Sequence, residues 1–205
     1  MLSKTNKGAL LAVVLTITTM TGLSQQPVSK PQSTVTNDFA LVANFEMGQV
    51  AQNGGGHFWL KGAGIDDAIT FFHGLGIAGT LEGGAASNIQ NNVSLDKVAV
   101  MGGPRYTTSL ARLTHGKAQR HGLNTYGEAL FGTAHGFNSV FPGTGGTLTR
   151  ANAFSMQLGG GLDVSLKGGL GLRALEVDWV RTTLPNNGSN EQNDLRLGFG
   201  ISYRR

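Results

Sequence analysis

The sequence predicts an all-β protein folded as a closed, antiparallel, up-and-down β-barrel of about eight strands. Composition is the first reason, because 32 glycines in 205 residues disfavour helices and favour strands and tight turns, and a charged fraction of 14% is unusual for a soluble enzyme. The second reason is an alternation of apolar and polar residues that recurs along the chain, which is the period of a strand with one apolar face. The third is length, because the alternating segments run for about 10 to 14 residues where globular strands have about 5 to 6.

The predicted strands follow one another from residue 38 onward. In the first, DFALVANFEMG, every odd position from Phe39 to Met47 is apolar, while Asn44 and Glu46 face the other way. In KVAVMGGPRYT the alternation continues, and Pro104 predicts a β-bulge because proline cannot donate to a ladder. The strand candidates are 38–48, 57–72, 75–84, 97–107, 123–134, 153–166, 170–184 and 193–205.

The polar face of these strands decides which solvent surrounds the barrel. A soluble ligand-binding barrel turns its apolar face inward, whereas a membrane barrel turns it outward to lipid. Here the polar face carries small residues and sparse charges, whereas a water-exposed exterior is usually about a quarter or more charged. We therefore predict that the polar face points inward in a transmembrane barrel, with a soluble lipocalin-like carrier as an alternative. The charges on this face are Glu46, Glu82, Glu128, Asp163, Arg173, Glu176, Asp178 and Arg196.

The connections between the predicted strands alternate in length. Short links at 73–74 and 167–169 are typical of the inner turns of a membrane barrel, and longer polar links are typical of its outer loops. The link at 107–121 breaks this rule, which indicates either strands that extend past the membrane or an insertion. The long links are predicted at 49–57, 85–94, 135–151 and 183–192.

The lumen of an eight-stranded barrel is just wide enough for side chains to fill, so no open aqueous pore is expected. Charges enclosed there need partners, because an isolated buried charge is costly. Arg173 and Glu176 are three positions apart and would face opposite sides of a regular strand, so a bulge between them is needed to bring both inside. The predicted lumenal polar network consists of Glu128, Arg173, Glu176, Arg196 and, at its outer edge, Asp178.

Aromatic residues are placed as two girdles near the rims of the predicted barrel, as in membrane barrels. Phe71 and Tyr126 are also assigned to the inner rim. The closing Arg204 and Arg205 would lie at the inner edge, where positive charge reaches water or phosphate. The girdle residues are Phe39, Tyr106 and Tyr203 at the inner rim, and Trp59, Phe154 and Trp179 at the outer rim.

The N-terminal residues 1–24 read as a secretory signal peptide, with two lysines, an apolar stretch and small residues before the cleavage site. Residues 25–37 form a polar tether, and 38–205 form the barrel domain. Cleavage removes two positive charges, Lys4 and Lys7, so the formal charge falls from +4 to +2. A net charge this small gives no reason to expect nucleic-acid binding. The chain has no cysteine, so neither a disulfide nor a lipid-carrying cysteine is available.

Motifs for catalysis, cofactors or metals are weak. GLGIAG at 74–79 matches the dinucleotide fingerprint by letters, but it opens a predicted strand instead of a helix. The histidines lie in links or at strand ends without a paired spacing; His135 beside Phe137 is the nearest candidate for a lipid-modifying site, which would need a serine. The cluster of Arg112, Lys117 and Arg120 is interpreted as a solvated inner turn, with lipid phosphate as the alternative. No catalytic, cofactor-binding or metal residue is assigned.

Several stretches carry a resemblance to a known family: VMGGPRYTTS, YGEALFG, AFSMQLGGGLDV and DLRLGFGISYRR. They resemble the outer-membrane β-barrel proteins of the outer-membrane protein A type, especially the small stand-alone barrels. The resemblance implies eight antiparallel strands, both termini in the periplasm, and a structural, adhesive or surface-exposed role without catalysis. Two features depart from the pattern: the pair Asp66-Asp67 in an expected apolar alternation, and a C-terminal Arg205 where many such barrels end on an aromatic residue.

These inferences combine into one functional expectation. The chain is expected to be a non-enzymatic, porin-like barrel in the outer membrane of a Gram-negative bacterium, with a side-chain-filled lumen and a role in envelope integrity or surface contact. Its expected partners are outer-membrane lipid, lipopolysaccharide and the barrel-insertion machinery, and it is expected to be a monomer. The alternatives are a lipid-modifying barrel enzyme and the soluble carrier.

Overall fold

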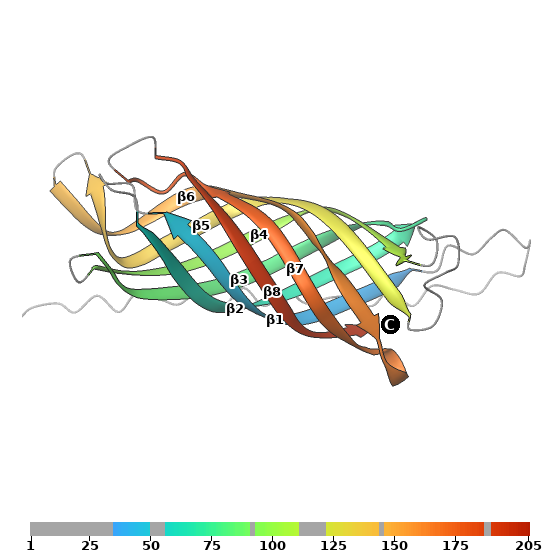
Figure 1. The fold of residues 1–205 in the computed structure, drawn as a ribbon. Helices are drawn as coiled ribbons and strands as arrows, with labels where there is room; N and C mark the ends of the chain where they lie inside the picture. The colour runs from blue at the N-terminus through green and yellow to red at the C-terminus, as the bar shows by residue number, and fades with distance from the viewer. Residues whose placement is uncertain (1–34, 50–55, 91–92, 111–121, 144–145, 187–189) are drawn as a thin grey trace, which may run out of the picture. The chain divides into compact units, whose positions relative to one another are not determined.

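The computed structural model describes residues 35–49, 56–90, 93–110, 122–143, 146–186 and 190–205. Eight antiparallel strands pair each with the next, and the last closes onto the first, so the predicted up-and-down barrel is confirmed (Figure 1). No helix in these residues is long and apolar enough to cross a membrane. The strands are β1 (Thr36–Gln49), β2 (His57–Phe72), β3 (Leu75–Gln90), β4 (Val93–Ser109), β5 (Leu123–Gly143), β6 (Gly146–Ser165), β7 (Leu170–Thr182) and β8 (Gln192–Arg204), with a 3-10 turn, η1 (Lys167–Gly169), before β7.

The two ends of the described chain are joined where the barrel closes. The β1–β8 ladder runs from Asp38 opposite Arg204 to Met47 opposite Leu195. Beyond it, the Asn37 N–H donates to the Arg205 carbonyl at 2.8 Å, and the Arg205 N–H donates back at 2.9 Å. The Arg204 guanidinium also pairs with the Asp38 carboxylate. The final arginines therefore continue the closure of the barrel.

The two links predicted to be short lie at the end of the barrel where β1 begins and β8 ends, which we call the turn end; the opposite end is the loop end. His73 and Gly74 both have positive φ, at 47° and 96°, the conformation of a two-residue hairpin turn. Gly168 and Gly169 also have positive φ, at 71° and 83°, within the turn before β7. Both predicted short links are confirmed.

Several strands are longer than predicted, and the strands as a set range in length from 13 to 21 residues. The links expected at 85–94 and 135–151 are wrong, because β3 and β4 continue to Gln90 and Val93, and β5 and β6 continue to Gly143 and Gly146. These segments lack an apolar alternation, but the backbone ladder of a hairpin does not require one. β4 likewise extends to Ser109, and the rest of the 107–121 link, from residue 111, lies outside the described residues.

The two predicted bulges had different outcomes. Pro104 makes no bulge: β4 keeps one register with β5 on both sides of Gly103 and Pro104, where the ladder only lacks pairs. A proline removes one donor without adding a residue, so the register can survive it. In β7 the register shifts between Arg173 and Glu176, and the predicted bulge there is confirmed.

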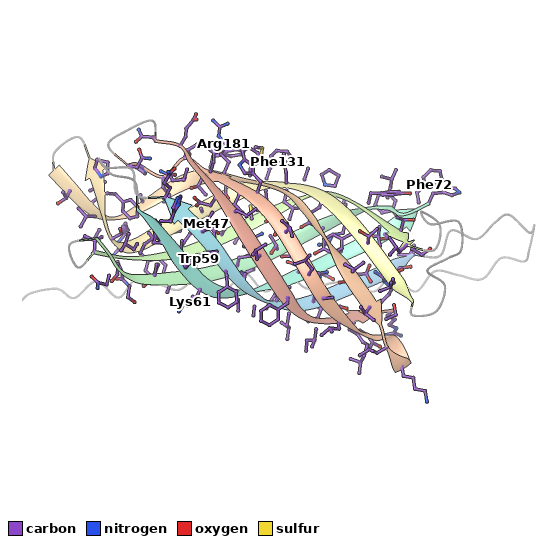
Figure 2. The ribbon with its side chains drawn as sticks, in the orientation of Figure 1. Met47, Trp59, Lys61, Phe72, Phe131 and Arg181 are labelled. Atoms are coloured by element: carbon purple, nitrogen blue, oxygen red, sulfur yellow. The ribbon has the colours of Figure 1, made fainter. Side chains whose placement is uncertain are left out.

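The barrel is apolar outside and polar inside. Along β1, Leu41 and Phe45 are exposed, while Asn44 and Glu46 between and beyond them are buried. Phe72 and Phe131 likewise project away from the wall (Figure 2). The interior also holds a cluster of mostly small apolar side chains. That cluster consists of Ala68, Ala78, Ala99, Met101, Leu130 and Ala134.

Candidate functional site in the lumen and on the outer surface

Arg173 is the centre of the largest polar cluster in the lumen. Its side chain is 1% exposed and contacts carboxylates from three strands. Nη1 donates to Glu176 Oε2 at 2.9 Å and Nε donates to Asp163 Oδ1 at 3.1 Å. Nη1 also pairs with Asp66, which lies across the lumen on β2. One guanidinium therefore ties β7 to both β6 and β2.

The bulge in β7 makes this arrangement possible. In the β6–β7 ladder, Leu162 of β6 pairs with Leu175 of β7. The next β6 residue, Asp163, pairs with Arg173, so Ala174 is the extra residue in β7. Arg173 and Glu176 are both buried, whereas Ala174 and Leu175 are both exposed. The extra residue restores the inward direction for Arg173 and lets the i, i+3 pair meet.

A second arginine joins the same cluster through Tyr126. The guanidinium carbons of Arg105 and Arg173 lie 4.1 and 4.6 Å from the centre of the Tyr126 ring. The Tyr126 hydroxyl donates to Glu176 Oε2 at 2.5 Å. The prediction that Tyr126 lies in the inner girdle is therefore wrong. Tyr126 and the buried Glu128 are two positions apart on one strand, so their side chains lie on the same face. We call this relation strand parity, and it directs the Tyr126 side chain into the lumen.

Arg105 and Gln157 hold Glu128 between them. Arg105 Nε and Nη2 both lie 2.6 Å from Glu128 Oε2, and Gln157 Nε2 donates to Glu128 Oε1 at 3.0 Å. Arg105 Nη2 is also 3.8 Å from Asp66 Oδ2, so Asp66 lies between the two arginines. We call the whole set the Arg173 cluster: Asp66, Arg105, Tyr126, Glu128, Gln157, Asp163, Arg173 and Glu176.

Arg196 on β8 organises a second group. Its Nη2 and Nε donate to Asp178 Oδ2 at 2.9 and 3.2 Å, and its Nη1 pairs with Glu82 on β3 across the lumen. Thr80 Oγ1 donates to Glu82 Oε1 at 3.2 Å. Closer to the loop end, Lys97 on β4 pairs with Glu46 on β1. The Arg196–Glu82 and Lys97–Glu46 pairs again join strands that are not neighbours in the wall.

The residues predicted for the lumenal network are thus distributed over two groups. Arg173, Glu176 and Glu128 belong to the Arg173 cluster, and Arg196 pairs with Asp178. Asp178, predicted at the outer edge of the network, is fully buried. The prediction omitted the partners Asp66, Arg105, Asp163, Glu82 and the Lys97–Glu46 pair, although strand parity places every one of them on the inward face.

The lumen offers little space for a ligand beside the Lys97–Glu46 pair. A cavity beside Lys97 and Glu46, lined also by Leu60 and Val180, measures about 10 Å³. That is roughly room for one water molecule. No group of three metal-ligating side chains with the geometry of a metal site occurs in the described part of the chain. The arrangement can hold strands together and fill the lumen with paired charges.

The predicted girdle residues lie on the outer surface. Phe39 pairs with Tyr203 across the β1–β8 closure at the turn end, and both are exposed. Trp59 lies opposite Met47, Met47 opposite Leu195, and Leu195 opposite Trp179. Both tryptophans therefore belong to one row of outward residues across four strands. Tyr106 and Phe154 are exposed at 47% and 52%.

His135 faces outward near the loop end. Its Nδ1 lies 2.5 Å from Asn152 Oδ1, and its ring stacks on Phe137 with centroids 5.8 Å apart. A side chain oriented in this way could act as a base, but its stacking partner is a phenylalanine and carries no nucleophile. His115, His121 and the cluster of Arg112, Lys117 and Arg120 lie outside the described residues.

Comparison with known proteins gives likenesses of fold. No family model and no curated protein matches the chain. Among solved structures, it is similar to the attachment invasion locus protein Ail of Yersinia pestis, crystallised with the heparin analogue sucrose octasulfate, at 13% identity and a TM-score of 0.48 over 83% of this chain and 97% of that one. It is also similar to Neisserial surface protein A, at 7% identity and 0.49 over 82% and 96%. A third is the N-terminal β-barrel domain of Pseudomonas aeruginosa OprF, at 13% identity and 0.41 over 82% and 97%.

Proposed function

We propose that the chain is a non-enzymatic outer-membrane β-barrel that contributes to envelope integrity or surface contact. The observation that carries this proposal is the inverted distribution of side chains. Large apolar residues such as Leu81, Ile77 and Phe199 are 49%, 58% and 55% exposed, while Arg173 and Arg196 are each 1% exposed. Lipid is the solvent that favours such an exterior, because water would leave this apolar area unburied.

The interior supports a structural role over transport. Ion pairs from Arg173 to Asp66 and from Arg196 to Glu82 cross the lumen. A lumen crossed by paired side chains resists the passage of solutes, so we infer a plugged barrel and not a pore. Any surface-contact activity then belongs to the outer face and the loop end, and the proposed partners are lipid, lipopolysaccharide and the insertion machinery.

The soluble carrier requires the apolar face to point inward, and the structure turns it outward. The lipid-modifying enzyme is tested separately by mass spectrometry of lipid A from cells with and without the chain. We expect no lipid species to change; an altered species that is lost in a His135→Ala variant would contradict the non-enzymatic proposal.

Membrane insertion is tested by expressing the full chain in a Gram-negative host. We expect it in the outer-membrane fraction, resistant to extraction by urea, with a gel mobility that changes on heating. A variant lacking residues 1–24 is the matched control for export and is expected to stay in the cytoplasm. Recovery of the intact chain as a detergent-independent periplasmic protein would overturn the proposal.

We infer that the loop end faces the outside of the cell and the turn end faces the periplasm. This orientation has its own test, since the natural chain contains no cysteine. Thr147→Cys places one thiol at the loop end and Lys167→Cys places one at the turn end. A membrane-impermeant maleimide applied to intact cells should label Thr147→Cys alone, and Lys167→Cys should react only after lysis. The reverse pattern would show that the loop end faces the periplasm.

A further inference from the structure

β5 and β6 continue as a two-stranded ribbon beyond the strands on either side of them. The β4–β5 ladder ends with Asp96 opposite Phe137, and the β6–β7 ladder ends with Ser155 opposite Thr182. The β5–β6 ladder runs on to Gly143 opposite Gly146. We call residues 138–143 and 146–154 the ribbon; it lies at the loop end of the barrel (Figure 1).

The β5 edge of the ribbon is irregular. Asn138 has a positive φ of 54°, and the register with β6 shifts between Phe137 and Phe141. Phe141 is buried, with its ring over Gly136 and close to Leu184. Pro142, which has no N–H, follows. Bulges and prolines are the devices by which natural sheets prevent an edge from pairing with another strand.

The β6 edge is regular, and on one side of it no described residue pairs with residues 148 to 152. The Phe154 N–H donates to Thr183 Oγ1 at 3.1 Å, and the Thr183 N–H donates to the Phe154 carbonyl at 3.0 Å, so the Phe154 backbone groups face the β7 side. Because a strand repeats every two residues, those of Asn152, Arg150 and Leu148 face the same side. No residue in the described ranges pairs with them there.

The side chains along this edge indicate what would pair with it. Arg150 is the sole charged residue among the described residues of the ribbon, and it is exposed. Leu148 is 51% exposed on the same face. Two copies of this chain meeting through the edge would bring two arginines and no carboxylate to the contact, which disfavours a homotypic pair.

We propose that the β6 edge formed by Leu148, Arg150 and Asn152 is a docking site for an extended, acidic segment of a partner protein. The segment adds a strand to the ribbon through its backbone, and a carboxylate opposite Arg150 sets its register. The inference deepens the surface-contact role and rests on the proposed orientation, which exposes the loop end outside the cell. The cysteine-labelling experiment tests that orientation independently, whereas binding to the purified barrel tests only the edge.

The probe is a fluorescein-labelled nine-residue peptide of alternating threonine and valine with a central glutamate, titrated into the full folded chain in detergent. We expect saturable binding, which disappears when alternate peptide nitrogens are methylated because the strand then loses its donors. A peptide with a central lysine should bind up to about fivefold more weakly, as for an exposed ion pair. The Arg150→Glu variant should reverse this preference.

Leu148→Pro is the decisive variant, because it removes one free N–H on the β6 edge without removing a donor of the β5–β6 ladder. Leu148→Ala is its matched control: it loses the side chain and keeps the N–H. We expect Leu148→Pro to abolish binding and Leu148→Ala, which keeps the backbone donor, to weaken it only partly, with heat-modifiable mobility confirming that both fold. Absence of binding by the natural chain up to about 1 mM peptide, or binding that survives peptide methylation, would overturn the proposal. Self-association that competes with the peptide would assign the edge to a second copy and overturn the acidic partner.

Discussion

The inward and outward faces of the same strands are specified in different ways. On β7, Arg173 and Glu176 face the lumen, and each contacts particular atoms of particular partners. Leu172 and Val177 lie on the other face of the same strand, exposed at 47% and 39%. The inner face depends on pairwise geometry, whereas the outer face depends on apolar character alone.

This difference predicts two kinds of sensitivity to mutation. An inward substitution should be costly when it removes one partner, even if the replacement is small and well tolerated in strands. An outward substitution should be nearly neutral as long as the residue stays apolar, and costly once it carries a charge into lipid. The substitutions that follow test the two faces against each other.

The largest effect is expected for Arg173→Ala. It leaves Asp66, Asp163 and Glu176 without the guanidinium that contacts all of them. Removing one partner of a buried ion pair costs about 3 to 5 kcal/mol. Urea unfolding of the refolded barrel in lipid vesicles measures this loss. Lys167→Ala, which removes an exposed cation from the turn end, is the control, and equal stability of the two variants would show that the Arg173 cluster contributes nothing.

The outward face should respond to charge and not to shape. Leu81 lies in the middle of β3, opposite the exposed Ile65 and Val100. Leu81→Arg should lower the free energy of unfolding in lipid vesicles by about 2 to 4 kcal/mol, because the guanidinium enters hydrocarbon.

Leu81→Ile is the matched control on this face and should unfold at nearly the same urea concentration as the natural chain. Equal stability of Leu81→Arg and Leu81→Ile in vesicles would contradict the proposed difference between the two faces. That result would mean that this part of the wall faces water.

Glycine positions give a test at smaller scale. A Cβ added at Gly159 would overlap the Asp178 carboxylate and the Val177 carbonyl, whereas one at Gly127 has only the Gly159 carbonyl near it, at 3.8 Å. Gly159→Ala should therefore cost about 1 to 3 kcal/mol through overpacking of the lumen. Gly127→Ala, on the outward face, should cost much less, and similar unfolding midpoints for the two would contradict a tightly filled interior.

The sequence predicted the direction of most side chains because parity is a local property. Asn44, Glu46 and Glu128 face inward as the alternation required. Even the bulge between Arg173 and Glu176 followed from parity, because two charges three positions apart needed a common side.

The partners of these side chains could not be predicted in the same way. Arg173 and Asp66 are separated by 107 residues, and Arg196 and Glu82 by 114. Which of them meet depends on the stagger of the strands when the barrel closes, and no local pattern carries that information. The aromatic character of Tyr126 predicts a girdle position, but its position two residues before the buried Glu128 indicates the lumen. The ribbon was missed because its ladder needs no apolar alternation.

The smallest expected change in unfolding free energy comes from a comparison of one tyrosine on each face. The Tyr126 hydroxyl donates to Glu176 Oε2 at 2.5 Å inside the lumen, whereas the Tyr106 ring is 47% exposed on the outer surface. Tyr126→Phe keeps the ring beside Arg105 and Arg173 and removes only this hydrogen bond to a charged acceptor, for an expected loss of about 1.5 kcal/mol. Tyr106→Phe should change the unfolding free energy by a few tenths of a kcal/mol at most. If both variants have the same unfolding free energy, the inner face tolerates the loss of a single hydrogen bond as easily as the outer face. The dependence of the inner face on particular partners would then be limited to its ion pairs.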